Sequence, residues 1–222
     1  MQAVILAAGE GNRMRPLTLT TPKPLLKIAG KPILDYIFEA LPKEIDEVIL
    51  VVKYLGSQIK EYCGDEKNGR RIIYAEGSEL GTAYSFLSAQ KYLRNGRFLF
   101  IYGDELPDKR DIVACLKYPA SILCWQVDDP WNHGVIIKST DGSIQDILEK
   151  PVNSPSKLIS DGVMVLNDKI FSCQPVQIKG EFYFTAMLRE FIKRESVIPV
   201  LSERGVGGIS TPKDLKRIEQ FL

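Results

Sequence analysis

The sequence has few of the features that mark a special class of protein. Its 29 Lys and Arg residues nearly balance its 28 Asp and Glu residues, and no long run of basic residues occurs. We therefore expect no nucleic acid and no membrane among its partners. No apolar run is long enough to span a bilayer, and the first residues lack the basic n-region of a signal peptide. Together these absences predict a cytoplasmic protein.

Cysteine and histidine are scarce as well. The chain has one histidine, His133, and four scattered cysteines without C-x-x-C spacing: Cys63, Cys115, Cys124 and Cys173. Neither the number nor the spacing of these residues suits a structural zinc site. We expect reduced thiols in or near the core.

Two common glycine-rich nucleotide signatures are also missing. Met14 stands where G-x-G-x-x-G would need its third glycine, and no G-x-x-x-x-G-K-[ST] occurs. The chain instead has an apolar run, Ala3 to Ala8, followed by the turn-forming residues Gly9 to Asn12. A buried strand that ends in such a loop directs several backbone N–H groups to one point, and this arrangement suits a phosphate.

Cations follow this loop directly. Arg13 and Arg15 come first, and Lys23 lies between Pro22 and Pro24, which restrict its backbone. Guanidinium and ammonium groups are the partners that a polyphosphate needs. A tight turn that carries solvated cations is the alternative interpretation. We predict that this stretch binds a nucleoside triphosphate.

The first half of the chain alternates between predicted strands and helices. Apolar runs predict strands over 47–52, 71–76 and 98–102, and helical spacing predicts helices over 32–41, 56–62 and 81–93. This order favours an α/β fold: a Rossmann-like, doubly wound, mainly parallel central sheet with helices on both faces. Ligands bind such sheets at the carboxyl ends of the strands. The glycine loop, Glu76 and Asp104 all follow strands there.

The second half changes rhythm. Strands are expected over 120–127, 134–138, 143–150 and 158–166, with a hairpin signal at Asp141-Gly142. We expect them to extend the main sheet and to form a small antiparallel flap. Helices are expected over 181–194 and, after an N-cap at Ser210-Thr211-Pro212, over 213–221. No linker is evident, so residues 1–222 are expected to form one domain.

The string LAAGEGNRMRPLTLTTPKPLL, residues 6–26, resembles the signature of the sugar-1-phosphate nucleotidylyltransferases, also called NDP-sugar pyrophosphorylases. The resemblance implies a nucleotide-diphospho-sugar transferase fold in a short single-domain form. It also implies an enzyme that transfers a nucleotidyl group from a nucleoside triphosphate (NTP) to a sugar 1-phosphate and releases pyrophosphate. The nucleotide-binding half would then be approximately 1–118, and the sugar-phosphate-binding half 119–222.

The resemblance also implies catalytic roles. Arg13 would steady the departing pyrophosphate, and Lys23 would contact the reacting phosphate. Asp104, in the family's G-D motif, would bind Mg²⁺, which takes oxygen ligands and shares itself with phosphates; the alternative is an Asp that caps a turn. The implied nucleotide-binding residues are Leu6, Ala8, Gly9, Gly11, Arg13, Glu76, Gly81 and Thr82.

Two later motifs extend the resemblance to the sugar. Glu149-Lys150-Pro151 is similar to the family's E-K-P, in which the glutamate takes sugar hydroxyls and the catalytic lysine grips the sugar phosphate. His133-Gly134-Val135 is similar to Y-G-V, with histidine in place of tyrosine. The implied sugar-phosphate-binding residues are Gly134, Glu149, Lys150 and Asp161.

The expected base depends on Glu76. Many relatives have a glutamine there, five residues before the glycine of L-G-T-A, which here is Gly81. A carboxylate accepts both adjacent donors of guanine, N1–H and the exocyclic amine, and this favours GTP. A glutamate also accepts from the single N–H of uracil, so uridylyl or thymidylyl transfer to another sugar phosphate stays an alternative.

Three positions depart from the family. Gly208 stands where relatives have a second metal-binding aspartate, Ala186 replaces an aspartate after Thr185, and Ser160-Asp161-Gly162 replaces N-A-G. Asp104 alone could hold the metal, or Asp161 or Glu181 could move in. A catalytically impaired regulatory protein that binds a nucleotide or an NDP-sugar is the remaining alternative. The sequence leaves a homo-oligomer open.

Overall fold

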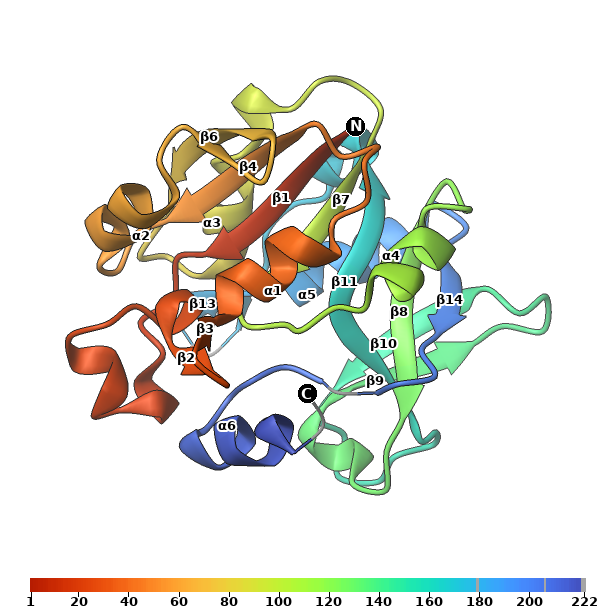
Figure 1. The fold of residues 1–222 in the computed structure, drawn as a ribbon. Helices are drawn as coiled ribbons and strands as arrows, with labels where there is room; N and C mark the ends of the chain where they lie inside the picture. Colours follow the sequence, from red (N-terminus) through yellow and green to blue (C-terminus); the bar gives the residue numbers. More distant parts are fainter. Residues whose placement is uncertain (179, 206, 221–222) are drawn as a thin grey trace.

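The computed structural model describes residues 1–178, 180–205 and 207–220. Its main feature is a ten-stranded sheet in the order β10-β9-β11-β7-β1-β4-β6-β5, with β8 and β14 branching from β11 (Figure 1). Neighbouring strands in the centre of this sheet run parallel: β7 (Arg97–Tyr102), β1 (Gln2–Ala7), β4 (Glu47–Val52) and β6 (Arg70–Glu76).

Antiparallel strands extend the sheet beyond β7. The strand β11 (Leu158–Asn167) pairs antiparallel with β7 and leads to β9 (Gly134–Lys138) and β10 (Ile144–Glu149). On the branch, β8 (Ser121–Gln126) pairs antiparallel with β11 and parallel with β14 (Ile198–Leu201). At the other edge, β5 (Glu66–Lys67) pairs antiparallel with β6. The predicted α/β fold with an antiparallel extension is confirmed.

Helices cover both faces of the sheet because the buried strands are apolar on both faces. Along β1, Ala3 and Ile5 face one core, whereas Val4 and Leu6 face the other. The first core is closed by α1 (Ile33–Ala40), α2 (Gly56–Cys63) and α4 (Lys109–Cys115). The second core is closed by α3 (Thr82–Leu87) and α5 (Phe184–Ile192).

The C-terminal segment returns to the glycine loop. Thr211 and Asp214 form a capping box at the start of α6 (Pro212–Glu219), as the N-cap signal predicts. A third core joins Ile209 and Ile218 to Met14 and Ile28, which lies in β2 (Lys27–Ile28) beside β3 (Lys31–Pro32). Residues 14–33 and the C-terminal segment with α6 therefore lie together on the lower side of the molecule in Figure 1, whereas the N-terminus lies at the top.

Two predicted helices are shorter than expected. The helix predicted over 81–93 ends at Leu87, since Ala89 N–H bonds to the Phe86 carbonyl three residues back, and a 3-10 turn (Gln90–Tyr92) follows. The helix predicted over 181–194 begins only at Phe184, because β13 (Glu181–Phe182) pairs with β12 (Gln177–Ile178). The last helix is described to Glu219, and position 221 lies outside the described residues.

The sequence patterns did not predict α4, β14 or several short segments. Among these segments are three 3-10 turns that carry the chain from the glycine loop to β2: Asn12–Met14, Leu17–Leu19 and Lys23–Leu25. The two-residue strands β2, β3, β5 and β12 were not predicted either. The four cysteines are buried and unpaired, as expected. Among the described residues, no helix is long and apolar enough to cross a membrane.

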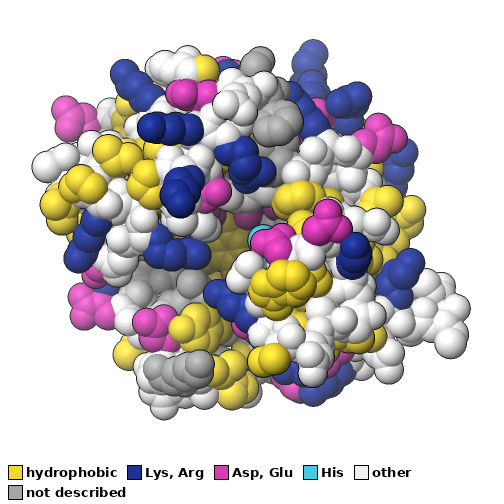
Figure 2. Space-filling view, turned by 90° about the horizontal axis from the view of Figure 1, so that it is seen from below, with side chains coloured by type: hydrophobic (Ala, Val, Ile, Leu, Met, Phe, Trp, Pro, Cys, Tyr) yellow, Lys and Arg dark blue, Asp and Glu magenta, His cyan; other side chains and the backbone are white. Residues whose placement is uncertain are grey.

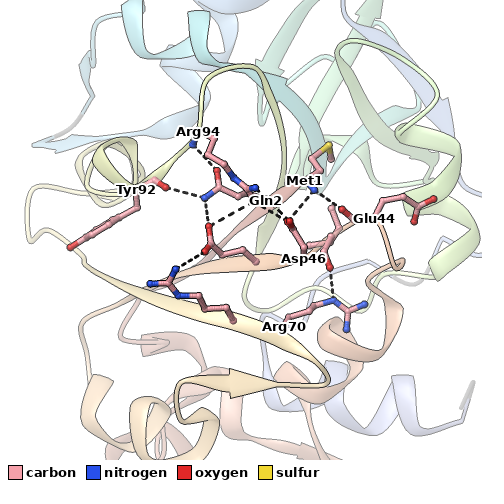
Figure 3. A network of polar contacts seen from close by, with 10 residues as sticks. Met1, Gln2, Glu44, Asp46, Arg70, Tyr92 and Arg94 are labelled. Atoms are coloured by element: carbon pink, nitrogen blue, oxygen red, sulfur yellow. Dashed lines mark hydrogen bonds and ion pairs between the residues drawn. The ribbon is translucent and has the colours of Figure 1, made fainter.

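A dense polar network closes the amino end of the central strands (Figure 3). The buried Gln2 side chain, 3% exposed, donates to Glu47 and to the Tyr92 carbonyl, and accepts from Arg94 N–H at 2.6 Å. The Arg94 guanidinium also pairs with Asp46 at 2.9 Å and lowers the pKa of that carboxyl to about 2. Arg70 donates to the Leu41 and Ile45 carbonyls.

Candidate active site

A cavity of about 340 Å³ lies at the opposite end of the sheet, where β1 and β7 end. Residues of the glycine loop and of the segment after β7 line it, and all but Ser210 come from the first half of the chain. Its lining includes Leu6, Gly9, Gly11, Arg13, Lys23, Thr82, Asp104 and Ser210. Figure 2 shows a hollow on this side of the molecule with Lys and Arg side chains around it.

A second cavity of about 760 Å³ adjoins the first. The two cavities share Arg13, Asp104 and Ser210 in their linings, so they are two lobes of one cleft. The second lobe is lined mainly by the second half of the chain and contains the predicted sugar-phosphate residues: Gly134, Glu149, Lys150 and Asp161. The predicted convergence of cations from the front and the middle of the chain is therefore present.

The glycine loop folds tightly onto Lys23. Gly11 has a left-handed backbone (φ +64), and a Cβ there would lie 3.0 Å from the Thr18 methyl carbon and 3.3 Å from the Lys23 Cβ. The Thr18 hydroxyl donates to the Gly11 carbonyl at 2.9 Å. A side chain at position 11 would be strained by its backbone conformation and crowded by these neighbours. Glycine at this position thus lets the loop pass close to Lys23.

Charges of both signs meet in the first lobe. The Lys23 ammonium forms an ion pair with the Asp104 carboxylate; their side chains are 12% and 29% exposed. Arg13 is exposed, and within the described part of the chain its guanidinium has no ion-pair or hydrogen-bond partner. The Lys23 ammonium can bind a phosphate, and the Asp104 carboxylate can bind a cation, once the two separate.

Lys150 enters the second lobe from a constrained backbone. It is one of the few non-glycine residues with a positive φ (+45), and its N–H donates to the His133 carbonyl at 2.9 Å. A lysine in the left-handed region costs free energy, and such residues concentrate at functional sites. Its ammonium lies 4.0 Å from the Glu149 carboxylate. This conformation fits a lysine that is held towards the cleft.

Sequence reasoning missed Glu105, which follows Asp104 directly. Its side chain is only 9% exposed and lines the second lobe beside Asp161. Burial raises the pKa of the Glu105 carboxyl well above its usual value, and the charges of Asp161 and Asp104 raise it further. Burial also raises the pKa of Asp161, which hydrogen-bonds with Glu105. The available signal was a second acidic residue next to Asp104, shortly after the buried apolar strand β7.

Three predicted nucleotide-binding residues lie outside the lining of the first lobe. Glu76 ends β6 with its side chain 73% exposed, and its carboxylate lies 4.0 Å from the Lys60 ammonium. Ala8 is partly buried, with Ala7 in the lining instead. Gly81 (φ +119) packs against β13, where a Cβ would lie 2.5 Å from the Phe182 carbonyl oxygen. The next residue, Thr82, lines the lobe and accepts from the Phe184 N–H.

The donors in the cleft suit a hard divalent cation. Among the described residues, no three His, Cys, Asp or Glu side chains lie close enough together to hold a metal ion. The cleft does present the oxygen ligands of Asp104, which Mg²⁺ prefers, and Mg²⁺ needs few protein ligands because water and substrate phosphates supply the rest. The residues present therefore fit a cation shared with a bound phosphate.

Comparisons with known proteins agree with this arrangement. A family model described as nucleotidyl transferase matches residues 2–196. The bifunctional protein GlmU of Methanocaldococcus jannaschii is 34% identical over 226 residues, covering 100% of this chain and 54% of that protein. AglF of Haloferax volcanii, named as a UTP–glucose-1-phosphate uridylyltransferase, is 30% identical over 236 residues, covering 100% of this chain and 96% of AglF.

The chain thus spans about half the length of the GlmU relatives that it matches. Among solved structures, UDP-glucose pyrophosphorylase complexed with UDP-glucose has a TM-score of 0.84 with this chain at 21% identity. The match covers 99% of this chain and 97% of the other. At this identity the likeness shows the fold alone.

Proposed function

This chain belongs to the nucleotidyl transferase family, and on that premise we propose that it transfers a nucleotidyl group from an NTP to a hexose-type sugar 1-phosphate, releasing pyrophosphate. The single observation that carries the proposal is the two-lobed cleft. Arg13 and Asp104 line both lobes, Lys23 lies in the first and Lys150 in the second. An NTP in the first lobe and a sugar phosphate in the second would meet at the shared residues.

Each cation has a separate role in this reaction. The loop of Gly9 to Arg13 receives the triphosphate, and the Arg13 guanidinium stabilises the charge on the leaving pyrophosphate. Lys23 leaves Asp104 to bind the reacting phosphate. Lys150 holds the sugar phosphate so that its oxygen is aimed at the α-phosphorus in line. The second lobe's Gly134, Glu149 and Asp161 contact the sugar.

A divalent cation, Mg²⁺ in our proposal, neutralises charge on the phosphates when it is bound. Asp104 holds it, because this carboxylate lines both lobes and is freed when Lys23 turns to a phosphate. The whole chain, 1–222, acts as one domain in this scheme, with the nucleotide in the half before about residue 118.

The proposed role of Glu76 is to select the base of the NTP. Its carboxylate can accept from both donors of guanine, which favours GTP, whereas the relative AglF is named for UTP. We therefore expect wild type to prefer GTP, and Glu76→Gln to shift the preference towards UTP. Steady-state rates with each nucleotide at one sugar 1-phosphate measure the shift. An unchanged ratio in the variant would remove Glu76 from base selection.

A matrix of common NTPs against common sugar 1-phosphates, with pyrophosphate release as the readout, tests the activity. The proposal expects at least one pair to release pyrophosphate only when both substrates are present. Gly208 and Ala186, which depart from the family, favour a regulatory protein as the second candidate. Nucleotide binding without turnover at any Mg²⁺ concentration would favour that second candidate.

A further inference from the structure

The Glu105 carboxylate lies close to Gly208, the position that carries no acidic side chain. A Cβ built on Gly208 would lie 2.9 Å from Glu105 Oε1 and 3.2 Å from Oε2. The three atoms nearest to that Cβ all belong to the Glu105 side chain. The Glu105 carboxylate therefore occupies the space into which a side chain at position 208 would project.

A second glycine makes room for Glu105 from another strand. A Cβ on Gly162, in β11, would lie 2.4 Å from Glu105 Oε1. Gly208 and Gly162 thus form a cradle for the Glu105 side chain, because a Cβ at either position would crowd the carboxylate. The segment of Gly208 is tied to the turn after β7, because Ile209 N–H donates to the Asp104 carbonyl at 2.9 Å. The cradle therefore holds Glu105 beside Asp104 and the shared part of the cleft.

Two other acids, Asp104 and Asp161, lie near the buried Glu105 carboxyl. Within the described residues, the hydrogen-bond partner of its carboxyl is another acid, Asp161, and no Lys or Arg forms an ion pair with it. The nearby Lys23 ammonium is taken by Asp104. Burying a carboxylate without a cation is costly, and so is placing it beside two other acids. Buried acids that lie side by side at a cleft are candidates for a functional role, and binding a cation is one such role.

We propose that Glu105 is the second protein carboxylate for the divalent cation, in the place that Gly208 leaves without one. The assignment rests on the proposed function for its purpose, because a cation there would lie beside the phosphates. Asp104 is the first ligand, on the exposed side of the cleft, and Glu105 is the second, on its buried side.

Direct metal binding tests this assignment without any catalysis. Mn²⁺ is titrated into the whole protein, and the free ion is measured by electron paramagnetic resonance. Glu105→Gln keeps the shape and the hydrogen bond to Asp161, so we expect it to fold and to bind Mn²⁺ about tenfold or more weakly than wild type. Glu149→Gln, which removes a carboxylate elsewhere in the second lobe, is the matched control and should bind like wild type.

A double variant that removes the carboxylate at position 105 and places one at position 208 gives a stricter test. The backbone of Gly208 is not left-handed, and the three atoms nearest to a Cβ there all belong to Glu105. We expect Glu105→Ala to lose Mn²⁺ affinity, Gly208→Asp alone to unfold at a lower temperature, and Glu105→Ala with Gly208→Asp to regain affinity. Mn²⁺ binding equal to wild type in Glu105→Gln, no regain in the double variant, or no binding by wild type would each overturn the assignment.

Pyrophosphate release by wild type separates this assignment from the proposed function. A wild type that binds Mn²⁺ through Glu105 but releases no pyrophosphate with any substrate pair refutes the activity and leaves the metal ligand. An active wild type whose Mn²⁺ affinity does not change in Glu105→Gln refutes the metal ligand and leaves the activity.

Discussion

The two ends of the central parallel sheet treat charge in opposite ways. At the amino end, Gln2, Asp46 and Arg94 satisfy one another in a closed network (Figure 3). At the carboxyl end, neither the exposed Arg13 guanidinium nor the buried Glu105 carboxyl has an ion-pair partner among the described residues. Satisfied charges stabilise a fold, whereas charges left unsatisfied at a cleft are available to a ligand. The difference favours the carboxyl end as the functional one.

Replacing Arg13 by Ala should impair activity at the carboxyl end of the sheet without affecting stability. We expect kcat/KM for pyrophosphate release to fall by about 10²–10³, since a donor aimed at developing charge is lost. The melting temperature should stay within about 1–2 °C of wild type, because the exposed guanidinium has no partner among the described residues. Arg15→Ala is the control, because Arg15 is exposed and pairs only with Glu10 at 3.4 Å. Equal rate losses in both variants would contradict the assignment of Arg13.

Lys150→Ala should distinguish the two lobes of the cleft by its effect on the KM of each substrate. Loss of a charged hydrogen bond to the sugar phosphate should raise the KM for sugar 1-phosphate by roughly 10–100-fold and leave the KM for the NTP nearly unchanged. Lys157→Ala, at an exposed ion pair with Asp128, is the matched control. An equal rise in both KM values would show that Lys150 does not distinguish the two lobes.

Gln2→Ala should weaken the polar network at the amino end of the central strands and lower stability. The substitution leaves the Tyr92 carbonyl and the Arg94 N–H without their partner in two part-buried hydrogen bonds, and a buried group left unsatisfied costs about 1–3 kcal/mol at most. We expect urea unfolding at a lower midpoint with unchanged steady-state kinetics. Gln177→Ala, on an exposed strand, serves as the control. A loss of activity in folded Gln2→Ala would show that the two ends are not independent.

Asp46 gives a smaller effect at the same end. Its pKa of about 2, lowered mainly by Arg94, lies below the value near 3.9 of an unfolded chain. A depressed pKa stabilises the folded state above about pH 4, and that contribution is lost as pH falls towards 2. The difference in urea midpoint between wild type and Asp46→Asn should therefore shrink from pH 5 to pH 3. A constant difference would contradict the pairing with Arg94.

Local patterns were enough to predict the central strands and the glycine loop. Strands such as Glu47–Val52 are apolar on both faces, so composition alone marks them as buried. The helix expected from residue 181 was misplaced because the pairing of β13 with β12 decides where it starts. Glu105 was missed for a similar reason. Its burial depends on Gly162 and Gly208, which lie far along the chain and reach it only in the folded protein.

The position of Glu76 also depended on the fold. The sequence placed Glu76 correctly at the end of a strand and also predicted that it binds the nucleotide, but Glu76 is not in the lining of the first lobe. Alternate residues of β6 face opposite sides of the sheet, so the end of a strand does not determine which way its last side chain points. The nucleotide preference of Glu76→Gln therefore remains the test of its role.

Phosphorus NMR of one reaction mixture tests the central claim most directly. Wild type is mixed with Mg²⁺, an NTP and a sugar 1-phosphate from a pair that is active in the matrix. The account predicts that NDP-sugar and pyrophosphate appear in equal amounts, and that neither appears when one substrate is left out. Release of inorganic phosphate from the NTP alone, or no product with any pair, would contradict it.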